Sequence, residues 1–179
     1  YDGKEMGRAQ VTQAYAAKIR PDVRMNPVLL KPNSQTGSQV IIKGKSIGNR
    51  DTIGYIDYKK IAFEAVKESY DSLASEYEAI ILEGAGSPGE INLKNHDIAY
   101  MAMAQYAKAP VLLVGDIDRG GVFASFIGSF CTFAPWEREL LKGFVINKFR
   151  GNRALLGPAF EMVERYTGKS IWGTVDHLK

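Results

Sequence analysis

The sequence predicts a mixed α/β fold built on a mainly parallel sheet. Four short apolar runs are bounded by glycine, proline or charged residues, and longer stretches with helical spacing lie between them. The runs are continuously apolar rather than alternating, which is typical of strands that are covered on both faces. We therefore expect helices on both faces of the sheet. No repeat or low-complexity linker divides the chain, so residues 1–179 are interpreted as a single domain.

The predicted elements follow from these patterns in chain order. Strands are expected at 79–82, 110–114, 143–146 and 171–175. Helices are expected at 5–18, 57–77, 98–108, 121–130 and 158–168. Between the first two helices, the stretch 26–45 contains two extended apolar pieces joined by a polar turn, which predicts a strand, a loop and a second strand.

Composition excludes several classes of function. The 23 basic and 20 acidic residues give a net charge of +3, and no basic run alternates with aromatic residues, so neither nucleic acid nor a membrane surface is expected as a partner. No apolar stretch is long enough for a membrane helix and no signal peptide is visible, which predicts a cytoplasmic protein. Cys131 is the single cysteine, and its apolar neighbours predict a buried structural thiol.

The end of the first predicted strand carries an acidic residue followed by glycines. In open α/β sheets, ligands bind beyond the carboxyl ends of the strands, so each strand end is a candidate site. Glu83 resembles the acidic position that holds magnesium in phosphate-transferring enzymes, and Gly84 and Gly86 would let phosphates approach the backbone. The alternative is that Glu83 pairs with a nearby lysine and that the glycines only turn the chain.

The next two strand ends are polar as well. Asp118 and Arg119 precede Gly120 and Gly121 at a predicted helix start, where they offer a charged fork and backbone donors for a carboxylate or phosphate. The alternative is an acidic helix cap with a self-contained Asp–Arg pair. Asn147 follows the third strand, and its amide could pair with a purine edge or simply cap a turn.

Several longer motifs resemble cobyric acid synthase, and they run from one end of the chain to the other. They are residues 2–10, 25–32, 83–93, 116–123 and 143–151. The resemblance implies a P-loop NTPase-like fold similar to dethiobiotin synthetase. It also implies an ATP-dependent enzyme of cobalamin biosynthesis, a glutamine amidotransferase that converts four side-chain carboxylates of cobyrinic acid a,c-diamide to amides through acyl phosphates. The familiar phosphate-binding pattern GxxxxGK[ST] does not occur in the sequence.

The resemblance also suggests roles for particular residues. Magnesium is expected on Glu83 and Glu5, and the adenine of ATP near Asn147. Contacts with phosphates or corrin carboxylates are expected from Lys31, Asp118 and Arg119. Two positions depart from the family pattern. Asn152 stands in place of Asp, which weakens any salt-bridge role near Arg153, and the final turn around His177 puts a ligand contact from the last loop in doubt.

The resemblance predicts further parts of a longer protein. We expect the P-loop unit before Tyr1 and a glutaminase domain after Lys179, so the 179 residues alone are a partial synthetase domain, predicted to be inactive and to bind ATP poorly. Low-micromolar affinity for Mg-ATP in isothermal titration would contradict this. Two alternatives stay open: the sister a,c-diamide synthase, which acts earlier on the same ring, and a non-catalytic ATPase switch similar to ParA and MinD.

Overall fold

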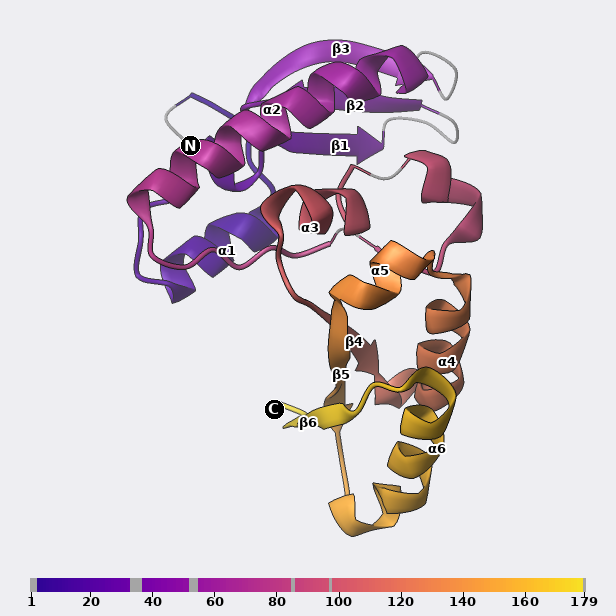
Figure 1. The fold of residues 1–179 in the computed structure, drawn as a ribbon. Coiled ribbons are helices and arrows are strands. Elements are labelled where there is room, and N and C mark those ends of the chain that lie inside the picture. The colour runs from indigo at the N-terminus through magenta and orange to yellow at the C-terminus, as the bar shows by residue number, and fades with distance from the viewer. Residues whose placement is uncertain (1–2, 33–36, 52–54, 85, 97, 179) are drawn as a thin grey trace. The chain divides into compact units, whose positions relative to one another are not determined.

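The chain divides into two compact units, Tyr1–Leu82 and Glu83–Lys179, and each is described by itself. The computed structural model describes residues 3–32, 37–51, 55–84, 86–96 and 98–178 (Figure 1). The single domain expected from the sequence stays a prediction. No helix within these described ranges is both long enough and apolar enough to cross a bilayer.

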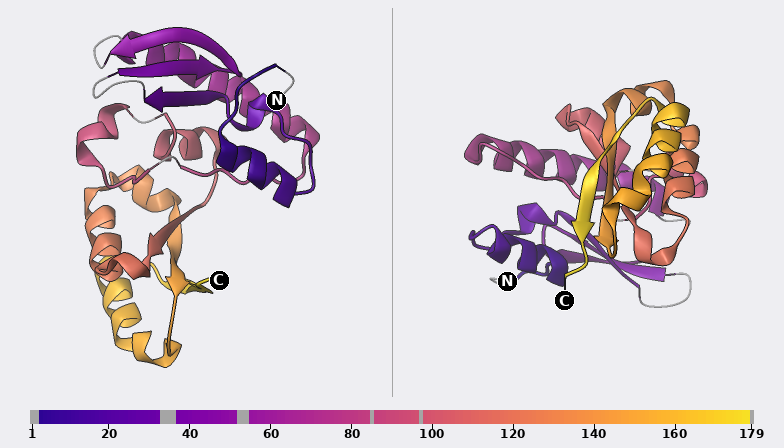
Figure 2. Two further views of the ribbon diagram at one scale, coloured as in Figure 1. Left: turned by 180° about the vertical axis from the view of Figure 1, so that it is seen from behind. Right: turned by 90° about the horizontal axis from the view of Figure 1, so that it is seen from below.

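The first unit is a three-stranded antiparallel sheet with two helices. Its strands are paired in the order β1-β2-β3, and α2 runs along one face of the sheet (Figure 2). The elements are α1 (Arg8–Ala16), the short 3-10 turn η1 (Val23–Met25), β1 (Val28–Pro32), β2 (Gly37–Ile42), β3 (Lys45–Asp51) and α2 (Tyr55–Glu76). The predicted strands at 26–45 are confirmed as β1 and β2, and the predicted loop between them lies mostly outside the described residues.

Strand β3 is an element that the sequence analysis missed. Its residues are mostly polar, with Ile47 as the one large apolar side chain, so it carries no alternating pattern. The pairing with β2 shifts register opposite Val40 and Ile41, which leaves Ile47 as an extra residue in a bulge. Pairing with β2, rather than an apolar face of its own, therefore makes this segment a strand.

Packing of α2 and a charged network hold the first unit together. Ala62, Ala65, Ser69 and Leu73 are buried, and their spacing places them on one face of α2. The guanidinium of Arg24 connects η1 to this helix: it donates to Asp22 Oδ2 (2.9 Å) and Ser72 Oγ (2.8 Å) and pairs with Glu76.

The second unit contains a parallel sheet in the order β4-β5-β6. Its elements are η2 (Ile91–His96), α3 (Met101–Ala107), β4 (Val111–Asp116), η3 (Ile117–Arg119), α4 (Val122–Thr132), α5 (Pro135–Leu140), β5 (Leu141–Phe149), η4 (Arg153–Leu156), α6 (Gly157–Thr167) and β6 (Ile171–Asp176). Three of the four predicted strands are confirmed as β4, β5 and β6. The predicted helices at 98–108, 121–130 and 158–168 correspond to α3, α4 and α6.

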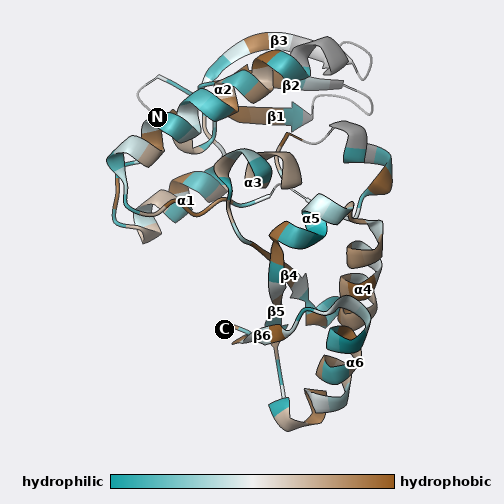
Figure 3. Cartoon of the chain, in the orientation of Figure 1, coloured by the Kyte–Doolittle hydropathy of each residue, from teal (hydrophilic) through white to brown (hydrophobic). Residues whose placement is uncertain are grey.

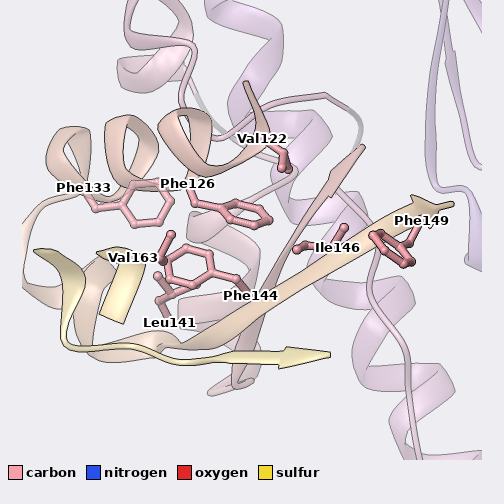
Figure 4. Packing of buried hydrophobic residues seen from close by; sticks show 8 residues of the cluster. All are labelled: Val122, Phe126, Phe133, Leu141, Phe144, Ile146, Phe149 and Val163. Carbon is pink, nitrogen blue, oxygen red and sulfur yellow. The ribbon is translucent and has the colours of Figure 1, made fainter. Parts of the chain in front are cut away.

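The core of the second unit lies between the sheet and helices α4 and α6. Helix α4 is hydrophobic along most of its length, and its Phe126 ring lies 4.7 Å from that of Phe144 on β5 (Figures 3 and 4). Val163 of α6 is fully buried against the same cluster. At Gly115 of β4, a Cβ atom would lie 2.5 Å from Val122 and 2.6 Å from Phe126, so glycine permits this close contact between strand and helix.

The prediction of helices on both faces is not met within the described part of the second unit. Leu112 and Val114 of β4 and Trp172 of β6 point away from the core and are 40, 58 and 61% exposed. The β4 residues alternate in burial, which is the pattern of a strand covered on one face only. The apolar character of these strands predicted more cover than this unit provides.

Two further predictions are wrong. Residues 79–82 form no regular strand, and Ile81 is 93% exposed. β-branched residues favour an extended backbone, but a strand needs a hydrogen-bonded neighbour, and no described strand pairs with this segment.

Cys131 is exposed rather than buried, because α4 turns Val122 and Phe126 toward the core and places Cys131 on another face.

Candidate functional site

The three parallel strands bring their polar carboxyl ends to one edge of the sheet. Asp116, the last residue of β4, is in register with Asn147 near the end of β5, and Phe149 is in register with Asp176 at the end of β6. The sequence analysis predicted separate polar strand ends. The sheet shows that two of them, after β4 and β5, are neighbours, and that the end of β6 lies beside them.

Asp116 is the central carboxylate of this edge. It accepts a hydrogen bond from Lys148 Nζ (2.7 Å) and one from the backbone N–H of Asp118 (3.0 Å), and Arg119 Nε lies 3.6 Å away. The Lys148 hydrogen bond, with help from the Asp118 N–H and the nearby charges, holds the pKa of the Asp116 carboxyl below its ordinary value. Asp116 is therefore an anion that pairs with one cation from β5 and one from η3.

Lys148 reaches Asp116 because the backbone of β5 is distorted there. Its φ is +58°, a left-handed conformation that costs a non-glycine residue about 1–2 kcal/mol. The register between β5 and β6 shifts between Ile146 and Phe149, so Asn147 and Lys148 leave the regular ladder. The Asn147 side-chain oxygen Oδ1 accepts a hydrogen bond from the Lys148 N–H (2.9 Å), a local contact of the kind considered as its alternative, and its role toward a purine stays a prediction.

A second set of ion pairs links the loops beyond the strands. Asp118 pairs with Arg150 Nη2 (3.3 Å), and His177 Nε2 lies 4.0 Å from the same carboxylate. Arg153 pairs with Asp176 (2.7 Å), so the loops after β4, β5 and β6 are connected by charge. Arg119 pairs with Asp116 in its own segment, which matches the Asp–Arg pair considered as the alternative, and Asp118 pairs with Arg150 of the next loop. Whether Asp118 and Arg119 also contact a ligand stays a prediction.

Gly120 and Gly121 are required by the backbone. Their φ angles are +72° and +68°, where other residues are strained, and a Cβ at either position would meet nothing within 4 Å. The sequence analysis predicted backbone donors for a carboxylate or phosphate at this point of the chain. The structure gives a conformational reason and leaves the space above them open.

Gly84 and Gly86 differ from Gly120 and Gly121, because close neighbours rather than backbone angles explain them. Neither has a positive φ, but a Cβ on Gly84 would lie 2.6 Å from Tyr100 Cδ1, and one on Gly86 would lie 2.3 Å from the Tyr100 hydroxyl. The space that was predicted to admit phosphates is bordered by a tyrosine. Whether phosphates also approach these glycines stays a prediction.

The remaining predicted residues are distributed over both units. Glu5 and Lys31 of the first unit form an ion pair with each other, and both side chains are roughly half exposed. Glu83 is exposed and is the first residue of the second unit. No group of three histidine, cysteine or carboxylate side chains able to hold a metal occurs among the residues that the structure describes. The magnesium site on Glu5 and Glu83 stays a prediction.

Lys148 and Arg150 are the basic residues of this edge that the sequence analysis did not single out. Both belong to the polar run that follows the predicted strand 143–146, and two cations so close to a predicted ligand site were the available signal. Their engagement with Asp116 and Asp118, which lie 32 residues earlier in the chain, could not be read from spacing.

These features define a class of protein: a mixed α/β protein whose charged residues gather at the carboxyl edge of a parallel sheet, where open α/β sheets bind ligands. The particular relatives are cobyric acid synthases. The chain is 58% identical over 177 residues to the cobyric acid synthase of Nitratidesulfovibrio vulgaris, covering 99% of this chain and 33% of that enzyme. The resemblance found in the motifs is thus confirmed over almost the entire chain.

Two further relatives agree. The adenosylcobalamin biosynthesis bifunctional protein CobDQ of Leptospira interrogans is 57% identical over 178 residues, which are 99% of this chain and 21% of that protein. The cobyric acid synthase of a Marinomonas species is 51% identical over 178 residues, with 36% of the enzyme covered. The chain therefore spans about a third or less of the length of these relatives. No family model matches the chain, and no solved structure matches it either.

Proposed function

We propose that this chain is part of the ATP-dependent synthetase portion of a cobyric acid synthase. The observation that carries the proposal is the 50–58% identity to enzymes of that name over 99% of the chain. The charged carboxyl edge of the second unit supports it, because this is where an α/β sheet would bind a nucleotide. The P-loop NTPase-like fold is part of the same proposal.

The proposed reaction forms an amide in two steps. A side-chain carboxylate oxygen of cobyrinic acid a,c-diamide attacks the γ-phosphorus of ATP, and ADP leaves, which gives an acyl phosphate. Ammonia, released from glutamine by a glutaminase domain of the full-length protein, then attacks the carbonyl carbon, and inorganic phosphate leaves. Phosphoryl transfer of this kind depends mainly on positioning and on neutralising charge, which basic side chains can provide.

The second unit supplies basic groups that suit this task. Arg119, Lys148 and Arg150 surround Asp116 and Asp118, and all three cations are largely exposed. A phosphate or corrin carboxylate that bound at this edge would compete with the two aspartates for the same cations. Asn147 would hold the adenine through its amide, and binding would require its contact with the Lys148 N–H to be shared or broken.

The ion pair between Glu5 and Lys31 of the first unit would open when each residue binds a ligand instead. In the ion pair, Lys31 neutralises Glu5. If Lys31 turned to a phosphate or a corrin carboxylate, the Glu5 carboxylate would be released to bind a cation. Glu83 offers a further carboxylate. Magnesium commonly takes one or two carboxylates together with substrate phosphates, so each of these carboxylates by itself has the chemistry of a ligand, and the ion would supply charge neutralisation at the phosphates.

A chimera tests the proposal without assumptions about the rest of the chain. The matching 177 residues of the Nitratidesulfovibrio vulgaris enzyme would be replaced by the corresponding residues of this chain. We expect ATP- and glutamine-dependent amidation of cobyrinic acid a,c-diamide, measured by mass spectrometry of the corrin product. A chimera that is folded by circular dichroism but makes no additional amide would refute the proposal. Amidation only of the less amidated precursor would instead indicate the sister a,c-diamide synthase.

Glu83→Gln in the chimera tests the proposed metal ligand. We expect amidation to fall by at least about 100-fold, as for removal of one electrostatic group from a phosphoryl-transfer site. Glu78→Gln is the matched control, because Glu78 is another exposed glutamate five residues earlier. Equal activity of the two variants would remove Glu83 from the mechanism. ATP turnover without any amide product would point to the switch alternative. The weak Mg-ATP binding of the 179 residues alone stays a separate prediction for isothermal titration.

A further inference from the structure

Tyr100 occupies the space that two glycines leave open after Glu83. The Tyr100 ring borders Gly84, where a Cβ would lie 2.6 Å from Cδ1 and 3.2 Å from Cε1. Its hydroxyl borders Gly86, where a Cβ would lie 2.3 Å away. Neither glycine has a left-handed φ, in contrast to Gly120 and Gly121, so lack of space explains them better than backbone conformation does.

The tyrosine is held at a fixed point of the fold. It is the residue at the N-terminus of α3, and its carbonyl oxygen accepts a hydrogen bond from the Ala104 N–H (3.0 Å). Met101 and Met103 are buried and anchor the first turn of that helix. The Cα of Tyr100 therefore cannot move away easily, and its ring restricts the course of the chain at Gly84 and Gly86.

The same segment is anchored a few residues later. A Cβ on Gly89 would lie 2.9 Å from Ser129 Oγ of α4, so the turn there contacts the helix closely. Lys94 Nζ donates to the Thr132 carbonyl oxygen (2.5 Å) and pairs with the buried Glu137 (2.5 Å). The chain that follows Glu83 is thus held by Tyr100 near its start and by α4 and α5 further on.

We propose that Tyr100 is a positioning residue for Glu83: its ring and hydroxyl fix the backbone at Gly84 and Gly86, and so set where the Glu83 carboxylate meets a divalent cation bound with ATP. The inference rests on the proposed function for its second half. Tyr100 itself is not a catalytic residue, because it acts through the backbone that carries Glu83.

Paired substitutions test the packing in the 179-residue chain itself. Gly86→Ala places a methyl group against the Tyr100 hydroxyl, and we expect the Tm to fall by at least about 3 °C. Tyr100→Phe removes that one oxygen, after which the nearest ring atom, Cζ, would be 3.5 Å from the methyl group, an ordinary contact. The double variant should therefore regain most of the lost Tm. Gly84→Ala is the matched control, because its methyl group meets the ring carbons, and Tyr100→Phe should not rescue it.

The chimera separates positioning from stability. For Gly86→Ala we expect the Mg²⁺ concentration that gives half-maximal amidation to rise by about tenfold or more, since small displacements at a reacting centre have large effects. The double variant with Tyr100→Phe should return it to within about twofold of the parent. Val163→Ala removes buried volume in the core under α6 and should lower Tm without changing the Mg²⁺ requirement.

The outcomes distinguish the two proposals. If Gly86→Ala is as stable as the parent, or Tyr100→Phe fails to rescue it, the packing inference is wrong whatever the enzyme does. If the packing couples as expected but the Mg²⁺ requirement stays constant in an active chimera, Tyr100 is structural only and the positioning inference is overturned. A folded chimera without amidation contradicts the proposed function, and the Tm measurements then decide by themselves whether Tyr100 packs against Gly86.

Discussion

Replacing Lys94 by methionine removes one charge from a pair that connects η2 to the α4–α5 corner. Methionine keeps most of the length and the apolar stem of the lysine. The ammonium that it removes lies 2.5 Å from Glu137 Oε2 and 2.5 Å from the Thr132 carbonyl oxygen, and 5.7 Å from the centre of the Phe133 ring. The Glu137 side chain is only 5% exposed. The variant therefore leaves a buried carboxylate without its cation.

The size of the effect follows from that burial. Removing one partner of a fully buried ion pair costs about 3–5 kcal/mol. Two features reduce this value: Lys94 is 27% exposed, so water can reach the site, and Glu137 still accepts a hydrogen bond from the Ala134 N–H (2.6 Å). The lost hydrogen bond to the Thr132 carbonyl oxygen adds about 1 kcal/mol. We expect Lys94→Met to lower the free energy of unfolding by about 2–4 kcal/mol.

Urea unfolding followed by circular dichroism measures this change. With an m-value of about 2 kcal/mol/M, the midpoint should fall by about 1–2 M. Adding Glu137→Gln removes the uncompensated charge and keeps an acceptor for Ala134, so the double variant should be more stable than Lys94→Met alone. Lys142→Met removes an exposed lysine on β5 and should cost less than about 0.5 kcal/mol. A cost for Lys94→Met as small as for this control, or additive effects in the double variant, would refute the reasoning.

Three further predictions concern other charged residues. Because the pKa of Asp116 is lowered in the folded state, chiefly by Lys148, its contribution to stability is present above the unfolded pKa and is lost as pH falls through the folded one; acid unfolding of Asp116→Asn should lack that component. Lys148→Gly should be more stable than Lys148→Ala by about 1 kcal/mol in thermal unfolding, since both variants lose the ammonium and only glycine adopts a φ of +58° without strain. Arg24→Lys should lose about 1–2 kcal/mol in urea unfolding, because an ammonium cannot contact Asp22 and Glu76 with the geometry of the guanidinium fork; a value near zero would show that charge alone suffices.

The sequence predicted well wherever a local pattern was strong. The apolar runs at 110–114, 143–146 and 171–175 are strands, and the helices between them lie close to the predicted ranges. The run at 79–82 has the same composition and is not a strand, since a strand also depends on a neighbour that composition does not reveal. In the same way, β3 is polar and becomes a strand because β2 pairs with it.

The candidate site shows the same division. Chemistry at single positions could be read from the sequence: acidic, basic and amide residues at strand ends, and glycines between them. Their partners could not, because Asp116 and Lys148 are 32 residues apart and meet only when β4 and β5 pair in register. Local patterns do not encode distances across a sheet.

The sequence by itself determined the α/β class, the five strands β1, β2, β4, β5 and β6, and the similarity to cobyric acid synthases, because these depend on local apolar patterns and on long motifs. Only the tertiary structure decided the reason for the glycines at the candidate site. Gly120 and Gly121 adopt a left-handed backbone, while Gly84 and Gly86 leave room for Tyr100. A glycine has no side chain to indicate its purpose, so its reason lies in the backbone angles and neighbouring atoms that folding brings to it.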